Sequence, residues 1–166
     1  MRQMIWVVIA SVLFTGLLFG GKSKPLVEAS YNKFKDVSTN KSRPVTRGGF
    51  QFNYDCPGNV TGCVPEAIFM NYARYSTSWL LMYARGLDLV FLVDGKPLTL
   101  QGLDWRGIPV GNGVEEWLSG TLTVEEFRSL ASAQQVEVEI GSTLHPKVTD
   151  KDLQAWKDFA ATIPVP

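Results

Sequence analysis

Residues 87–100 read L-D-L-V-F-L-V-D-G-K-P-L-T-L, and this stretch predicts an antiparallel β-hairpin. The apolar run at 87–93 is rich in Leu and Val and has the length of a buried strand. Asp94-Gly95 follows it directly, and this pair tolerates the positive φ angles that a two-residue hairpin turn requires. The return strand is expected at 97–100. A hairpin of this kind favours a mainly β or α+β fold.

Further strands are expected on both sides of this hairpin. Residues 50–54 alternate apolar and polar side chains, which places Phe50, Phe52 and Tyr54 on one face of a strand. The lead-in at 25–48 is expected to contain short extended pieces at 34–37 and 42–46. Similar patterns predict strands at 67–75, 114–123 and 136–140, with a turn at Gly111-Asn112-Gly113 before the second of them.

Two helices are expected late in the chain. Thr123 and Glu126 have the spacing of a capping box, in which a threonine N-cap and an acidic residue three positions later exchange hydrogen bonds. A second helix is expected to begin after Thr149, and its apolar stripe consists of Leu153, Trp156, Phe159 and Ala160. A helical turn is expected at 79–83. About seven short strands and two late helices predict an antiparallel immunoglobulin-like sandwich, formed as a single domain over residues 24–166.

The N-terminus has the layout of a secretory signal peptide. Arg2 precedes an uncharged apolar run at 4–19, and small and polar residues follow it. We expect a signal peptide at 1–23, cleaved after Ser23. The alternative is an uncleaved membrane anchor through residues 4–21. An anchor is disfavoured because the run is shorter than the ~20 residues of a span and because Lys22 and Lys24 would have to be exported. Either way, the chain is expected to be exported to the periplasm or cell envelope.

The charge of the chain excludes one class of partner. The sequence carries 16 basic and 16 acidic residues. Cleavage after Ser23 would remove two basic residues (Arg2 and Lys22) and no acidic one, so the net charge would fall from zero to about −2. A weakly acidic domain lacks the basic footprint of a nucleic-acid-binding protein, and none is expected here. With the signal cleaved, no membrane span is expected in the mature chain.

Cys56 and Cys63 are the two cysteines of the chain, and P-G-N-V-T-G separates them. In an exported protein, two cysteines across a turn-rich loop are expected to form a disulfide. Because the loop is short, the bond would contribute only about 2 kcal/mol. Two cysteines and one histidine are too few ligands for a zinc site, so no metal is expected.

No motif for catalysis is present, and the chain is predicted not to be an enzyme. His145 is the single histidine, and no G-x-S-x-G sequence frames a serine nucleophile. The adjacent pair Glu115-Glu116 would point its side chains in different directions on a strand. Glu137 and Glu139 share a face, which is expected to be solvated. No dinucleotide or calcium motif is present, so no cofactor is expected.

Aromatic residues interleaved with arginines suggest a binding surface. Tyr75, Trp79 and Arg85 lie close together in the sequence, and Trp105-Arg106 stands between glycines in an expected loop. Such residues stack on sugars or make cation–π contacts with a partner. The alternative is that the same aromatics belong to the core, with an arginine stem packed beside them.

The sequence resembles a group of uncharacterised exported bacterial proteins. The resemblance rests on the motifs F-K-D-V (34–37), L-V-F-L-V-D-G-K-P-L (89–98), V-G-N-G (110–113), E-E-F-R-S-L-A-S-A (125–133), V-E-V-E-I-G-S-T (136–143) and L-Q-A-W-K-D-F (153–159). It implies a bacterial envelope protein without an assigned activity. The Cys56–Cys63 insert departs from the pattern, and this departure leaves the role of the loop open.

Together these features favour a non-enzymatic binding or interaction module of the cell envelope, whose partner is an envelope protein or a glycan. The expected surface consists of Tyr75, Trp79, Trp105 and Arg106, with Arg85 nearby. Two alternatives from other classes stay open. One is a carboxylate-based enzyme acting on envelope polysaccharide, and the other is a structural or assembly protein.

Overall fold

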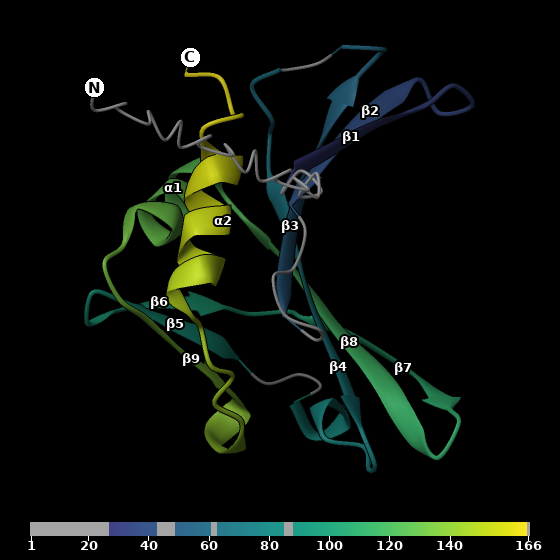
Figure 1. Ribbon diagram of the computed structural model, residues 1–166, viewed down its shortest axis with the longest axis vertical. Coiled ribbons are helices and arrows are strands. Elements are labelled where there is room, and N and C mark those ends of the chain that lie inside the picture. The colour runs from purple at the N-terminus through teal and green to yellow at the C-terminus, as the bar shows by residue number, and fades with distance from the viewer. Residues whose placement is uncertain (1–26, 43–48, 61–62, 85–87, 166) are drawn as a thin grey trace, which may run out of the picture.

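A computed structural model describes residues 27–42, 49–60, 63–84 and 88–165 of the chain (Figure 1). The expected signal peptide or anchor, residues 43–46 of the extended piece expected at 42–46, and Arg85 lie outside these residues. Within the described part of the chain, no helix has the length and apolar character needed to cross a membrane.

The larger of two antiparallel sheets has six strands in the order β1-β2-β3-β4-β8-β7. These strands are β1 (Val27–Asn32), β2 (Val37–Ser42), β3 (Phe50–Pro57), β4 (Ile68–Ser76), β7 (Asp104–Val110) and β8 (Gly113–Leu122). The smaller sheet has the order β6-β5-β9 and consists of β5 (Leu89–Val93), β6 (Lys96–Leu100) and β9 (Val136–Ile140). The helices are the 3-10 turns η1 (Leu81–Ala84) and η2 (Gly141–Thr143) and the α-helices α1 (Val124–Ser132) and α2 (Asp150–Ala160).

The prediction of a mainly antiparallel β fold with two sheets and two late helices is confirmed. The described chain has nine strands, where about seven were expected. The expectation at 34–37 is wrong in detail, because residues 33–36 form the turn between β1 and β2 and only Val37 belongs to a strand. Asp36 has a φ of 49° in this turn, and the Phe34 side chain at its tip is 89% exposed.

The local signals in the sequence correspond to real elements. Leu89–Val93 pairs with Lys96–Leu100 around Asp94 and Gly95, whose φ angles are 48° and 79°. The capping box predicted at Thr123 forms, and the second helix begins after Thr149 as expected, where the structure shows a second capping box with Asp152. The sulfurs of Cys56 and Cys63 lie at disulfide distance, with the Cα atoms 5.8 Å apart. The bond joins the buried end of β3 to the loop before β4.

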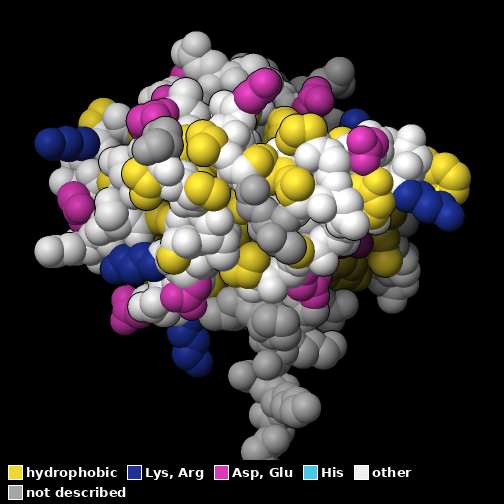
Figure 2. Space-filling model, turned by 90° about the horizontal axis from the view of Figure 1, so that it is seen from above, with side chains coloured by type: hydrophobic (Ala, Val, Ile, Leu, Met, Phe, Trp, Pro, Cys, Tyr) yellow, Lys and Arg dark blue, Asp and Glu magenta, His cyan; other side chains and the backbone are white. Residues whose placement is uncertain are grey.

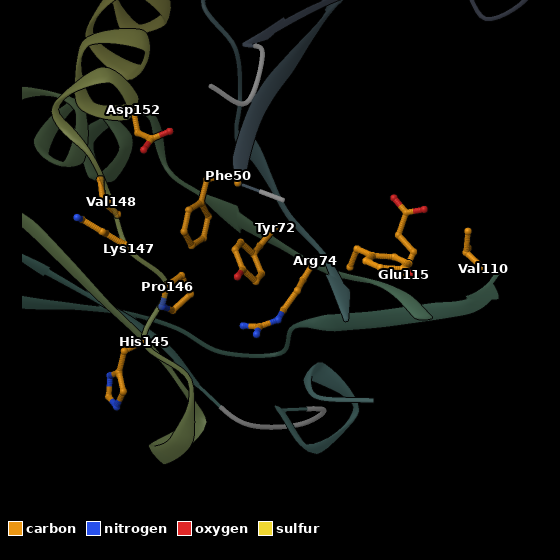
Figure 3. A pocket seen from close by; sticks show the side chains of 12 residues that line it. Phe50, Tyr72, Arg74, Val110, Glu115, His145, Pro146, Lys147, Val148 and Asp152 are labelled. Carbon is orange, nitrogen blue, oxygen red and sulfur yellow. The ribbon is translucent and has the colours of Figure 1, made fainter. Parts of the chain in front are cut away.

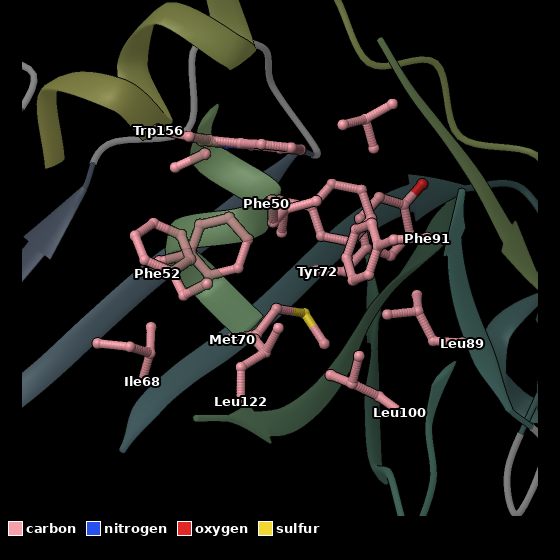
Figure 4. Packing of buried hydrophobic residues seen from close by; sticks show 14 of the residues in the cluster. Phe50, Phe52, Ile68, Met70, Tyr72, Leu89, Phe91, Leu100, Leu122 and Trp156 are labelled. Atoms are coloured by element: carbon pink, nitrogen blue, oxygen red, sulfur yellow. The ribbon is translucent and has the colours of Figure 1, made fainter. Parts of the chain in front are cut away.

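The core lies between the large sheet and a layer made of the small sheet and the two helices (Figure 4). Side chains along β3 contact each part of that layer in turn. The ring centroid of Phe50 lies 5.3 Å from that of Phe91 in β5. Phe52 packs against Phe127 of α1 at 4.7 Å and Trp156 of α2 at 5.3 Å. This arrangement leaves the chain between β9 and α2 to span the gap beside Phe50.

Candidate functional site

A cleft of about 780 Å³ opens where residues 145–148, between η2 and α2, pass in front of the large sheet (Figure 3). Phe50, Tyr72 and Arg74 form its sheet wall, and Pro146 faces them from the opposite side. Its far end reaches the rim of the sheet at Tyr75, Val110 and Glu115. We refer to it as the Arg74 cleft.

The period-two pattern of β4 explains why Arg74 points into this cleft. Ile68, Met70 and Tyr72 are buried on the inner face of the strand, and Arg74 is the next residue on that face. In the cleft, the guanidinium lies below the Tyr72 ring (Figure 3). Burial raises the pKa of the Tyr72 hydroxyl, and the Arg74 charge and hydrogen bond lower it in part. The Tyr72 hydroxyl is therefore uncharged at neutral pH, and it does not neutralise the charge of Arg74.

Arg74 has no carboxylate partner among the described residues. Its direct neighbour across the β4–β8 ladder is Glu116, but the Glu116 carboxylate is occupied elsewhere. Asp152 at the upper end of the cleft accepts hydrogen bonds from the Thr149 backbone and hydroxyl as part of the cap of α2. A half-buried guanidinium without a carboxylate partner can donate charge-assisted, bidentate hydrogen bonds to an anionic group of a ligand.

Glu116 is a fully buried carboxylate with four hydrogen bonds. Its Oε2 accepts from the backbone N–H groups of Leu80 and Leu81 at 2.6 and 3.0 Å. Its Oε1 accepts from the Met82 N–H at 2.8 Å and from the indole Nε1–H of Trp105 at 3.1 Å. These contacts fix the first turn of η1 against the sheet. Glu116 therefore has a structural role, which the sequence alone did not reveal.

Two of the predicted binding residues belong to this buried cluster. Trp105 was expected in an exposed loop, and this expectation is wrong, because it lies in β7 opposite the buried Leu118. Its ring is half-buried and meets Trp79 edge-on, with the centroids 5.7 Å apart. A side chain at Gly107 would collide with the Trp79 ring, so the glycine permits this packing. Trp79 and Trp105 thus pack against each other, and both are half-buried.

The structure places the other two predicted residues, Tyr75 of β4 and Arg106 of β7, on the outer face of the large sheet. Arg106 pairs with Trp117, and Tyr75 pairs with Glu115, so all four side chains point away from the core. Tyr75 is 54% exposed, and Trp117 is half-buried. The four predicted residues therefore do not form one surface, because Tyr75 and Arg106 lie on the outer face of the sheet, whereas Trp105 lies on its inner face against Trp79. Arg85 lies outside the described residues.

Sequence reasoning did not single out Arg74, and it did not place Trp117 on the outer face. Arg74 could have been found by extending the alternation of Ile68, Met70 and Tyr72 by one step. Trp117 gave no comparable signal, because its direction depends on the register of β8 with two neighbours.

His145 is exposed, with its Nδ1 3.9 Å from the Glu139 carboxylate. Across the described residues, no group of three or more His, Cys, Asp or Glu side chains could hold a metal ion. On the face shown in Figure 2, basic and acidic side chains are interspersed, without a stripe of one sign.

No protein-family model, curated protein or solved structure matches the chain. The interpretation of the site therefore rests on its own geometry.

Proposed function

We propose that the chain is an exported, non-catalytic binding module of the cell envelope that binds an acidic saccharide in the Arg74 cleft. The observation that carries this proposal is Arg74 itself, a half-buried arginine that faces an aromatic-lined cleft and has no carboxylate partner among the described residues. An arginine in such a position binds carboxylates in a defined orientation.

The size and lining of the cleft support a ligand of saccharide size. A volume of about 780 Å³ falls within the ~300–1,000 Å³ typical of small-molecule sites. The rings of Phe50 and Tyr72 close the floor of the cleft and are only 5% and 4% exposed, so most of the surface that a sugar would contact is polar. The Cys56–Cys63 disulfide agrees with an exported location, since such bonds persist in oxidising compartments.

The two carboxylates that line the cleft argue for binding rather than hydrolysis. Glycosidases place two carboxyl groups on either side of the scissile bond, within about 5–10 Å of each other. Here Asp152 is part of a helix cap, and Glu115 lies at the opposite end of the cleft beside Val110 (Figure 3). Neither is directed at the space next to Arg74.

Calorimetric titration with a glucuronate-containing oligosaccharide, and with its neutral glucose counterpart, tests this proposal. We expect the acidic probe to bind and the neutral probe to bind at least about 10-fold more weakly, because a charge-assisted hydrogen bond is worth ~1.5–3 kcal/mol. Arg74→Gln should reduce the affinity by a similar factor, whereas Arg74→Lys should retain part of it.

Arg106→Gln is the matched control, because it removes the same charge from the outer face of the sheet. It should leave affinity within twofold of wild type. A loss caused by Arg106→Gln and not by Arg74→Gln would place the site on the outer face with Tyr75 and Trp117. Release of shorter saccharides during the titration would favour the enzymatic alternative.

A further inference from the structure

Among the described residues, no strand pairs with the outer edge of β9 in the small sheet. Successive residues of a strand point their N–H and C=O groups to opposite sides. Gln135 and Gly141, which flank β9, form backbone hydrogen bonds on the side of β5. The Gln135 C=O accepts from the Asp94 N–H, and the Gly141 N–H donates to the Asp88 C=O. Ile140 bonds in the opposite direction, to Leu144. The backbone groups of Val136 and Val138 must therefore point the same way as those of Ile140, toward the open edge.

The chain itself begins to cover this edge and then leaves it. After the turn η2, Leu144 forms a single antiparallel bridge with Ile140, through hydrogen bonds of 2.7 and 3.3 Å. Residues 145–148 then run on toward α2 without pairing to Val138 or Val136. A groove of about 650 Å³ separates this segment from β9, and the outward side chains of Val90 and Leu92 contribute to its lining.

Prolines interrupt two of the other sheet edges. Pro97 lies in the edge strand β6, and Pro109 lies in the edge strand β7. Proline has no N–H to donate and protects an edge from strand addition. β9 (V-E-V-E-I) has no proline and combines unpaired backbone groups with a groove beside them.

We infer that β9 accepts an extended segment of a partner protein, which adds to the small sheet as a fourth strand in this groove. Main-chain hydrogen bonds to Val136 and Val138 would provide the pairing, as in other cases of strand addition. Glu137 and Glu139 are both exposed on the outer face and would lie beside the side chains of the added strand. Among the described residues that line the groove, Lys147 is the one lysine or arginine, so the segment should carry basic residues opposite the two glutamates.

The same two glutamates disfavour a second copy of this chain as the occupant. In an antiparallel β9–β9 pair centred on Val138, Glu137 of each copy would face Glu139 of the other. Like charges placed directly opposite each other destabilise a strand pair. A basic extended segment makes the opposite, favourable contact.

The test measures amide hydrogen exchange of the full-length protein in a mild nonionic detergent, by NMR or mass spectrometry. The probe is the blocked peptide K-V-K-V-K-V-K, and the control peptide is E-V-E-V-E-V-E. We expect the basic peptide at saturation to slow exchange at Val136 and Val138 by at least about 10-fold, because these amides gain partners. The acidic peptide should cause no protection.

The variant Glu137→Lys/Glu139→Lys, which changes only exposed side chains, should reverse the preference for the two peptides. Three results would overturn the inference. The first is that neither peptide protects Val136 and Val138 from exchange. The second is that both peptides protect them equally. The third is that protection increases with protein concentration when no peptide is present. Because Arg74 does not line the β9 groove, Arg74→Gln should leave the peptide effect unchanged, and this separates the test from that of the proposed function.

Discussion

Glu116 shows how one buried side chain organises a region of this protein. Burying a carboxylate is costly unless hydrogen bonds replace its lost hydration. Four donors do so here, three from the backbone of residues 80–82 and one from Trp105. They hold η1, Trp79 and Trp105 at the end of the sheet that also carries Arg74. The position of the candidate site therefore depends on a residue that does not itself line it.

We predict that Glu116→Gln destabilises the protein by about 3 kcal/mol. Each carboxylate oxygen accepts two hydrogen bonds, and an amide can accept on one side only. The NH₂ group of the glutamine would face two N–H donors, and each buried donor left without a partner costs ~1–3 kcal/mol. Chemical denaturation measures the change. Glu115→Gln is the control, because Glu115 is half-exposed on the opposite face, and it should change stability by less than about 0.5 kcal/mol. Equal stabilities for the two variants would show that the buried network contributes nothing.

At the scale of elements, the sequence predicts what is local. The Asp94-Gly95 turn, the capping box at Thr123 and the helix start after Thr149 depend on neighbours within three residues, and all three are confirmed. The strand at Trp105 was missed because D-W-R-G-I-P-V contains a glycine and a proline, which are both depleted in strands. Only pairing with β8 makes this segment a strand.

Trp156 packs helix α2 against the large sheet. This side chain is 2% exposed and lies edge-on to Phe50 and Phe52, with ring centroids 6.0 and 5.3 Å away. Trp156→Ala should therefore lower the free energy of unfolding by about 3–5 kcal/mol, as expected for truncation of a large core side chain. Thermal or chemical denaturation tests this expectation.

Lys157→Ala, on the exposed side of the same helix, is its control and should cost less than about 0.5 kcal/mol. A melting midpoint for Trp156→Ala that is equal to that of the control would mean that α2 is not docked as described.

For the whole molecule, the position of the Arg74 cleft could not be predicted from the sequence. Its walls come from β3, from β4 and from the segment 145–148, which is about 70 residues later in the chain. Composition and periodicity give the direction of Arg74 on its own strand, but they do not place Pro146 opposite it. That placement depends on how β9 and α2 are connected across the gap beside Phe50. The same path of the chain leaves the β9 edge open on its other side.

This architecture predicts that the domain unfolds as one cooperative unit. Phe50 contacts Tyr72 of the large sheet, Phe91 of the small sheet and Trp156 of α2, so every layer shares one cluster. The β4–β8 ladder runs without interruption from Ile68 and Leu122 to Ser76 and Val114, which connects the core to the end that holds Trp79 and Trp105. Domains of fewer than about 150 residues usually unfold in a two-state transition.

In the double variant Trp6→Phe/Trp156→Phe, fluorescence reports only on the three tryptophans at that end of the sheet (Trp79, Trp105 and Trp117), while far-UV circular dichroism reports on both sheets and both helices. We expect the two signals to give the same denaturation midpoint, because the ladder transmits any loss of core packing to the end of the sheet. An earlier fluorescence midpoint would show that the Glu116 region opens separately. The Arg74 cleft, which lies between the two regions, would then exist only while both are folded.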